Sequence, residues 1–283
     1  MIEWHRAPAR AQSAPIGAIY DRWVTPEGEV KAEFSRTPNG YLIRFPKEAD
    51  FEISLDPRCV TGWPVPGMEE RHFESLFHHA IVPLIGNHEG GLFLHGSAVT
   101  IGDRAVAFLG LSRTGKTTMA GAMARAGHPF LTEDVIELTV DGGDYLLQPK
   151  RSQLRLFGDS AAHLMGEDFR ADDPDEKYTV SGSDILPFRD RPCPLARVYL
   201  LGNDPSAPLA ITPLAPPLAL TQLLQHSFVL DVEDKQRLRS HFGRLGELSE
   251  KIAVRGLDYP RQYSELPAVI EAIVTDLENN QDL

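Results

Sequence analysis

Residues 105–118 read AVAFLGLSRTGKTT, an apolar strand pattern that passes directly into the motif G-x-x-x-x-G-K-T. Gly110 and Gly115 allow the backbone to curl so that consecutive N–H groups point at phosphate oxygens, and the following helix adds the positive end of its dipole. Lys116 is placed to reach the β- and γ-phosphates, and Thr117 to ligate Mg²⁺. The motif therefore predicts a nucleoside triphosphate site, and we expect ATP and Mg²⁺ as its ligands. The predicted binding residues are Gly110, Ser112, Arg113, Thr114, Gly115, Lys116, Thr117 and Thr118.

The composition limits the classes of protein to which the chain can belong. Its 283 residues are 42% hydrophobic and 24% charged, as in an ordinary globular protein, and their net charge of −12 argues against a nucleic-acid surface. No apolar stretch approaches the roughly 20 residues that span a bilayer, and the N-terminus does not resemble a secretory signal. We therefore expect a cytoplasmic protein without a nucleic-acid or membrane partner. Cys59 and Cys193 lie in no C-x-x-C pair, so we expect no metal or redox framework from them.

The chain divides by composition into two parts. Residues 1–66 are rich in Pro and Gly and contain short alternating runs at 40–45 and 49–55, which predict a small β-rich module. Residues 67–283 then form the P-loop domain. Apolar residues at helical spacing predict a helix over 68–85, with one face packed on the module that follows.

The P-loop domain alternates predicted strands and helices, which indicates an α/β fold. Residues 158–183 are charged and irregular, and we expect a mobile loop or lid there. We expect strands at 92–99, 105–109, 132–138, 196–201 and 252–255, helices at 117–126, 219–225, 235–251 and 264–277, and a linker at 213–217.

Two further features flank the P-loop in the sequence. His95 lies at a strand end before the P-loop strand, and Glu133 and Asp134 lie at the end of an apolar run after the P-loop helix. Neighbours on a strand point to opposite sides, so one carboxylate can face Mg²⁺ while the other meets an incoming hydroxyl. Thr117, Glu133 and Asp134 are the predicted metal ligands, and which carboxylate is the base stays open. A core role for His95, and an ATPase metal site for the two carboxylates, fit the same pattern.

The order of a His-Gly element, a P-loop and an acidic pair resembles the HPr kinase/phosphorylase family. The resemblance covers residues 95–156 and includes the strand pattern that follows the acidic pair. It implies an α/β, P-loop-containing core like the C-terminal domain of HPr kinase, which is similar to the nucleotide site of phosphoenolpyruvate carboxykinase. It also implies that Glu133 or Asp134 deprotonates a serine hydroxyl, while Lys116 and the metal stabilise the transferring γ-phosphoryl group. His95, Lys116, Glu133 and Asp134 form the expected catalytic set, and homo-oligomers are common in the family.

The chain departs from the family's pattern in three respects. Residue 133 is Glu where the family usually has Asp, the glycine-rich signature of the bifunctional enzymes is not evident, and the N-terminal module is short. These departures indicate a kinase without efficient phosphorylase activity. They favour a likeness to the shorter HPr-kinase-like proteins, including those that phosphorylate a serine near the C-terminus of a lasso-peptide or other modified-peptide precursor. We therefore expect a peptide or small protein as the acceptor.

Two other functions fit the same motifs. In one, ATP reshapes the lid at 158–183 to recruit a partner, with no phosphotransfer. In the other, the acceptor is a small molecule. Within the predicted lid and the strand before it, Lys177 and Arg155 fit either a closing contact with ATP or acceptor, or a solvated surface. Arg113 likewise fits either a phosphate contact or solvent.

Overall fold

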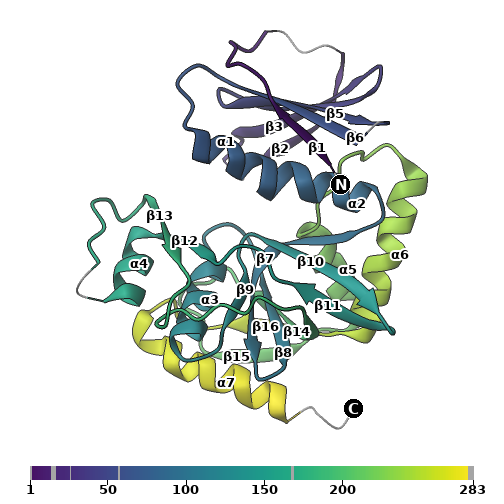
Figure 1. The fold of residues 1–283 in the computed structure, drawn as a ribbon. Coiled ribbons are helices and arrows are strands. Elements are labelled where there is room, and N and C mark those ends of the chain that lie inside the picture. The colour runs from purple at the N-terminus through teal and green to yellow at the C-terminus, as the bar shows by residue number, and fades with distance from the viewer. Residues whose placement is uncertain (1, 14–16, 26, 57, 167–168, 280–283) are drawn as a thin grey trace. The chain divides into compact units, whose positions relative to one another are not determined.

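A computed structural model describes residues 2–13, 17–25, 27–56, 58–166 and 169–279. The chain forms two compact units, one made of Met1–Ile85 with Val229–Leu238 and the other of Gly86–Phe228 with Arg239–Leu283 (Figure 1). The two units are described separately below.

The first unit contains a six-stranded sheet in the order β1-β6-β5-β4-β3-β2. Strand β1 pairs with β6 in parallel, and the other neighbours are antiparallel. The strands are β1 (Glu3–Arg6), β2 (Ile19–Val24), β3 (Val30–Thr37), β4 (Gly40–Phe45), β5 (Ala49–Leu55) and β6 (Arg58–Pro64). The strands predicted at 40–45 and 49–55 are confirmed as β4 and β5.

The predicted helix over 68–85 is present but packs differently from the expectation. It consists of α1 (Glu70–Leu76), a π-helical turn (Phe77–Ile81) and α2 (Val82–His88). The rings of Phe73 and Phe77 lie 5.6 and 4.0 Å from the ring of Trp4, so this helix face covers the first sheet. Because of this aromatic packing, the first unit extends past residue 66, the domain boundary that composition predicts, to Ile85.

A distant segment completes the first unit. Asp231 is buried and accepts hydrogen bonds from Arg36 at 2.8 Å and from the hydroxyl of Tyr41 at 2.9 Å. These contacts join residues about 190 positions apart, so no local sequence pattern predicts them. The division of the chain at a single point is therefore too simple.

The second unit is built on an eight-stranded sheet in the order β11-β10-β7-β8-β14-β16-β15, with β9 paired to β7. Strand β14 runs parallel to β8 and to β16, and the other neighbours are antiparallel. The strands are β7 (Leu92–Ile101), β8 (Arg104–Leu109), β9 (Phe130–Thr132), β10 (Val135–Asp141), β11 (Asp144–Gln148), β14 (Cys193–Leu201), β15 (Ala210–Pro213) and β16 (Ala253–Asp258).

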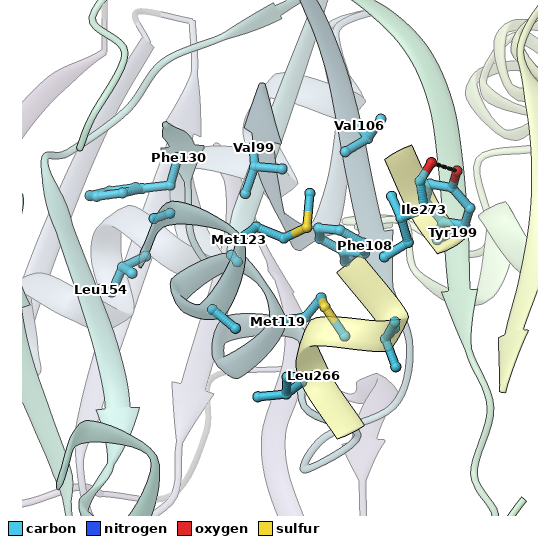
Figure 2. Close-up of a cluster of buried hydrophobic side chains, with 14 of the residues drawn as sticks. Val99, Val106, Phe108, Met119, Met123, Phe130, Leu154, Tyr199, Leu266 and Ile273 are labelled. Carbon is cyan, nitrogen blue, oxygen red and sulfur yellow. Dashed lines mark hydrogen bonds between the residues drawn. The ribbon is translucent and has the colours of Figure 1, made fainter. Parts of the chain in front are cut away.

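Helices cover both faces of this sheet (Figure 1). Side chains alternate along β8, as a strand requires: Phe108 packs with α3 and α7, whereas Leu109 packs with α5 and α6. Figure 2 shows Phe108 among Met119, Met123 and Ile273. The helices are α3 (Lys116–Arg125), α4 (Gly158–Met165), α5 (Pro216–Gln225), α6 (Lys235–Lys251) and α7 (Leu266–Glu278), with a 3-10 turn at Tyr263–Glu265 before α7. The unit is thus a mixed α/β structure.

The stretch predicted to be irregular, 158–183, contains regular structure. Helix α4 occupies its start, and β13 (Lys177–Ser181) pairs antiparallel with β12 (Gln153–Phe157) in a two-stranded sheet, a long hairpin whose connection contains α4. Leu154, Leu156 and Leu164 are buried against α3, and their burial holds the segment in place. Residues 167–168 of the predicted lid lie outside the described residues. The predicted linker at 213–217 likewise includes the start of α5.

None of the helices in the described part of the chain is both long and apolar enough to cross a membrane.

Acid should destabilise the fold through His241 on α6. This side chain is buried, its Nε2 has no hydrogen-bond partner among the described residues, and burial together with the charge of Arg244 lowers its pKa to about 4. A histidine in the unfolded chain titrates near about 6.5, so between these values the unfolded chain binds more protons than the folded one. The free energy of unfolding should therefore fall as the pH falls through that window, by about 2 kcal/mol between pH 7.5 and 5 from this residue alone.

Urea unfolding of the parent and of His241→Leu at several pH values measures this contribution. The variant should lose about 2 kcal/mol less between pH 7.5 and 5 than the parent does. His72→Gln, at a side chain that is 44% exposed, is the control and should keep the parental pH dependence. An unchanged pH dependence in His241→Leu would contradict this interpretation.

Candidate nucleotide-binding site

The loop between β8 and α3 has the backbone of a phosphate cradle. Gly115 has φ 92°, a left-handed conformation that favours glycine, and it caps the N-terminus of α3. Thr114 turns inward, because its hydroxyl donates to the carbonyl oxygen of Leu111 at 2.8 Å. The loop therefore directs the free N–H groups at the start of α3 toward one point.

Lys116 is buried at the base of this loop. Its Nζ donates to the carbonyl oxygens of Gly110 at 3.0 Å and Leu111 at 2.9 Å, and burial lowers its pKa to about 8. Phosphate oxygens offer this ammonium stronger, charged acceptors than the two carbonyls do. Lys116 is thus held in the loop, ready to exchange these bonds for bonds to phosphate.

Strand register brings the predicted residues to one edge of the sheet. Gly96 pairs with Leu109 at the end of β8, and His95 pairs with Val135 at the start of β10. Gly96 is required there, since a Cβ would lie 2.6 Å from the backbone carbonyl oxygen of Phe108. His95, the P-loop and the acidic pair therefore meet at the carboxyl end of β8, where α/β sheets bind ligands.

The acidic pair does not continue a strand, as the alternation argument assumed. It forms a kink between β9 and β10, with Asp134 at φ 63° and the Thr132 hydroxyl donating to the carbonyl oxygen of Val135 at 2.6 Å. Glu133 is buried, and its Oε1 accepts from the hydroxyl of Thr117 at 3.5 Å. Asp134 instead lines the cavity beside the loop. The kink, and not strand alternation, gives the two carboxylates different surroundings, and their side chains stay within hydrogen-bonding distance of each other.

The electrostatics of the pair follow from this burial. Loss of solvent contact, and then the neighbouring charge of Asp134, raise the pKa of Glu133 well above its usual value. The charges of Lys177 and Arg155 act in the opposite direction. Two carboxylates held this close, one of them buried, favour binding of a cation.

Oxygen donors of this kind suit Mg²⁺. A hydroxyl and carboxylates are the hard ligands that Mg²⁺ prefers, and it usually takes one or two of them together with phosphate oxygens. Thr117 and Glu133 already lie side by side at the base of the cradle, with Asp134 next in the chain. The residues present therefore fit the predicted metal.

A cavity of about 510 Å³ opens over the loop and lies wholly within the second unit. Of the predicted binding residues, Ser112, Arg113, Gly115, Lys116, Thr117 and Thr118 line it, whereas Gly110 and Thr114 are not among its lining residues. Of the predicted catalytic residues, His95, Lys116 and Asp134 line it, and Glu133 lies behind Thr117. Arg155 and Lys177 also line the cavity.

A second histidine, missed by sequence reasoning, lies beside His95. The carbonyl oxygen of the buried His226 accepts from the backbone N–H of His95 at 2.7 Å. Burial and the charge of Lys116 lower the pKa of both imidazoles to about 4. His95 therefore faces the cavity as a neutral ring. His226 follows α5, about 130 residues after His95, and no local pattern marks it.

The far side of the cavity also comes from segments that the sequence motifs do not include. The Thr118 hydroxyl lies 2.9 Å from that of Ser160, which lies 3.1 Å from that of Tyr263, and Tyr263 donates to Asp159 at 2.8 Å. Thr118 directly follows Thr117, the predicted metal ligand of the P-loop. The hydroxyls of Thr118, Ser160 and Tyr263 therefore form a polar part of the cavity lining that is distinct from the predicted catalytic residues. Parallel pairing of β14 with both β8 and β16 brings Tyr263 here.

Comparisons with known proteins give distant structural likenesses only. No protein-family model and no curated protein matches the chain. Among solved structures, the chain is similar to the HPr(Ser) kinase/phosphatase from Coxiella burnetii. The sequence identity is 16%, the match covers 67% of this chain and 92% of that chain, and the TM-score is 0.36.

Removal of the Lys116 ammonium should weaken nucleotide binding without loss of the fold. A hydrogen bond to a charged group contributes about 1.5–3 kcal/mol, so we expect Lys116→Met to raise the Kd for Mg²⁺·ATP by about 10–100-fold in calorimetric titration. Lys251→Met, at the exposed C-terminal end of α6, is the matched control and should bind like the parent. Equal affinity of Lys116→Met and the control would remove Lys116 from the binding site.

Proposed function

We propose that this protein is an ATP- and Mg²⁺-dependent kinase that transfers the γ-phosphoryl group to a hydroxyl of a peptide or small protein. The observation that carries the proposal is the division of the acidic pair. Glu133 is buried against Thr117, whereas Asp134 faces the cavity beside Lys116 and His95. A site that only binds nucleotide needs the first carboxylate, but a second one facing the cavity supplies a base for an acceptor.

Each residue then has a distinct task. Lys116 and the loop amides bind the β- and γ-phosphates, and Thr117 with Glu133 would hold Mg²⁺, which neutralises phosphate charge when bound. Asp134 accepts the proton of the acceptor hydroxyl as its oxygen bonds to the γ-phosphorus and the bond from that phosphorus to the leaving ADP oxygen breaks. The neutral ring of His95 orients the acceptor or the γ-phosphate. Catalysis is mostly positioning and charge stabilisation.

The acceptor class rests on the sequence. The order of His95-Gly96, the P-loop and Glu133-Asp134 supports a serine acceptor, and the short N-terminal module supports a modified-peptide precursor, lasso peptides included. We also propose that the protein forms a homo-oligomer and acts in the cytoplasm.

Labelled ATP with a peptide library tests the reaction. We expect label on serine, and we expect Asp134→Asn to lower kcat by at least about 100-fold with little change in ATP affinity, because only the proton acceptor is lost. Glu133→Gln should instead raise the Mg²⁺ concentration required for half-maximal rate. Asp141→Asn, an exposed carboxylate on β10, is the control.

Three outcomes would overturn parts of this proposal. ATP binding without any labelled product would support a nucleotide-dependent switch. Label confined to a low-mass fraction would indicate a small-molecule kinase. Parental kcat in Asp134→Asn would exclude it as the base.

A further inference from the structure

The hairpin of β12 and β13 presents two different faces. Leu154, Leu156 and Val180 are buried in the core that includes α3. The alternate residues of β12, Arg155 and Phe157, line the candidate nucleotide cavity, and Leu156 borders it as well. The buried side chains thus fix the hairpin, and β12 forms a wall of the site.

Lys177 is placed on this wall by strand pairing. It pairs with Phe157 across the hairpin, and its Nζ lies 5.4 Å from the centre of the Phe157 ring. The guanidinium of Arg113, in the P-loop, lies 5.1 Å from the same ring, and Arg113 also pairs with Asp175 at 3.5 Å. One aromatic ring therefore joins the loop that cradles phosphate to the strand that carries Lys177.

The charge of Lys177 reaches the groups at the reacting end of the cavity. Lys177 lines the same cavity as His95, Lys116 and Asp134. Arg155, on the paired strand β12, lines this cavity as well. Among the described residues Lys177 forms no ion pair within 4.0 Å that would hold its ammonium away from the site.

We propose that Lys177 is a catalytic residue whose ammonium contacts the transferring γ-phosphoryl group opposite Lys116. This inference rests on the proposed kinase function. During transfer, negative charge spreads over the three equatorial oxygens of the phosphoryl group as one P–O bond breaks and another forms. Lys116 approaches from the loop, and Lys177 approaches from the hairpin. Lys177 keeps its protons throughout and acts by its charge alone.

Lys177→Met tests the proposal through a transition-state analogue. We expect a kcat at least about 100-fold lower than the parental value, with the Kd for Mg²⁺·ADP within about threefold. Aluminium fluoride, which mimics the phosphoryl group in transfer, should tighten ADP binding in the parent and do so at least about tenfold less in the variant. Lys177→Arg should recover part of both effects, because it restores the positive charge.

Lys150→Met is the matched control. Its Nζ also lies over a phenylalanine ring, 5.5 Å from Phe93, but Lys150 does not line the cavity. It should keep parental kcat and parental fluoride dependence. Thermal unfolding checks that the variants fold, and Lys177→Gln, which keeps a long polar side chain, replaces Lys177→Met if that variant does not.

The outcomes separate this inference from the kinase proposal. A parental protein that shows neither phosphotransfer nor fluoride-enhanced ADP binding overturns both. A parental protein that turns over while Lys177→Met keeps its kcat overturns the role of Lys177 alone. A raised KM with unchanged kcat in Lys177→Met also overturns it, because that result assigns Lys177 to ground-state binding.

Discussion

The pairing of Gly96 with Leu109 is the constraint on which the site depends. Because residue 96 has no side chain, β7 approaches the last residue of β8 closely, and a Cβ there would lie 2.6 Å from the carbonyl oxygen of Phe108. This pairing brings His95, which precedes Gly96 on β7, to the same edge of the sheet as Gly110, the first P-loop residue after β8. Strand β10 pairs with the other edge of β7 and begins at Val135, directly after the turn at Asp134. Three segments separated in sequence therefore reach one edge by backbone hydrogen bonds alone.

Both positive and negative side chains are concentrated at this edge, although the chain as a whole has a net charge of −12. Lys116, Arg155 and Lys177 line the same cavity as Asp134, with Glu133 buried behind them. Burial lowers the pKa of the Lys116 ammonium and raises that of the Glu133 carboxyl, so each group is costly in its charged form without a partner. The triphosphate and cation that we propose as ligands would supply both opposite charges at once. The net negative charge of the chain does not prevent this, since fields inside a cleft are set by the nearest groups.

Local patterns in the sequence predict the local parts of this arrangement well. The P-loop, its strand and its helix follow from residue types at fixed spacing, and so do β4, β5 and α6. Contacts across long sequence distances leave no such pattern, which is why Asp231 in the first unit, and His226 and Tyr263 at the site, are found only in the structure. The strand pattern of β12 is part of the resemblance, but β13 and its pairing with β12 were missed for another reason: the charged residues of 170–177 dominate the composition, while the burial of Leu154 and Leu156 decides the conformation.

The backbone kink at Asp134 determines where each carboxylate of the acidic pair lies. In an extended strand, neighbouring carboxylates point to opposite faces, and only one of them can reach the P-loop. At φ 63°, Asp134 leaves the strand path, so Glu133 reaches Thr117 while Asp134 still faces the cavity. A left-handed residue other than glycine costs about 1 kcal/mol, least for Asp and Asn, whose short side chains tolerate it. Arg113 in the P-loop has φ 64°, so two of the three such residues in the described part of the chain border this cavity. The surroundings of the cavity therefore hold two residues in a less favourable backbone conformation, one of them the carboxylate that faces the cavity.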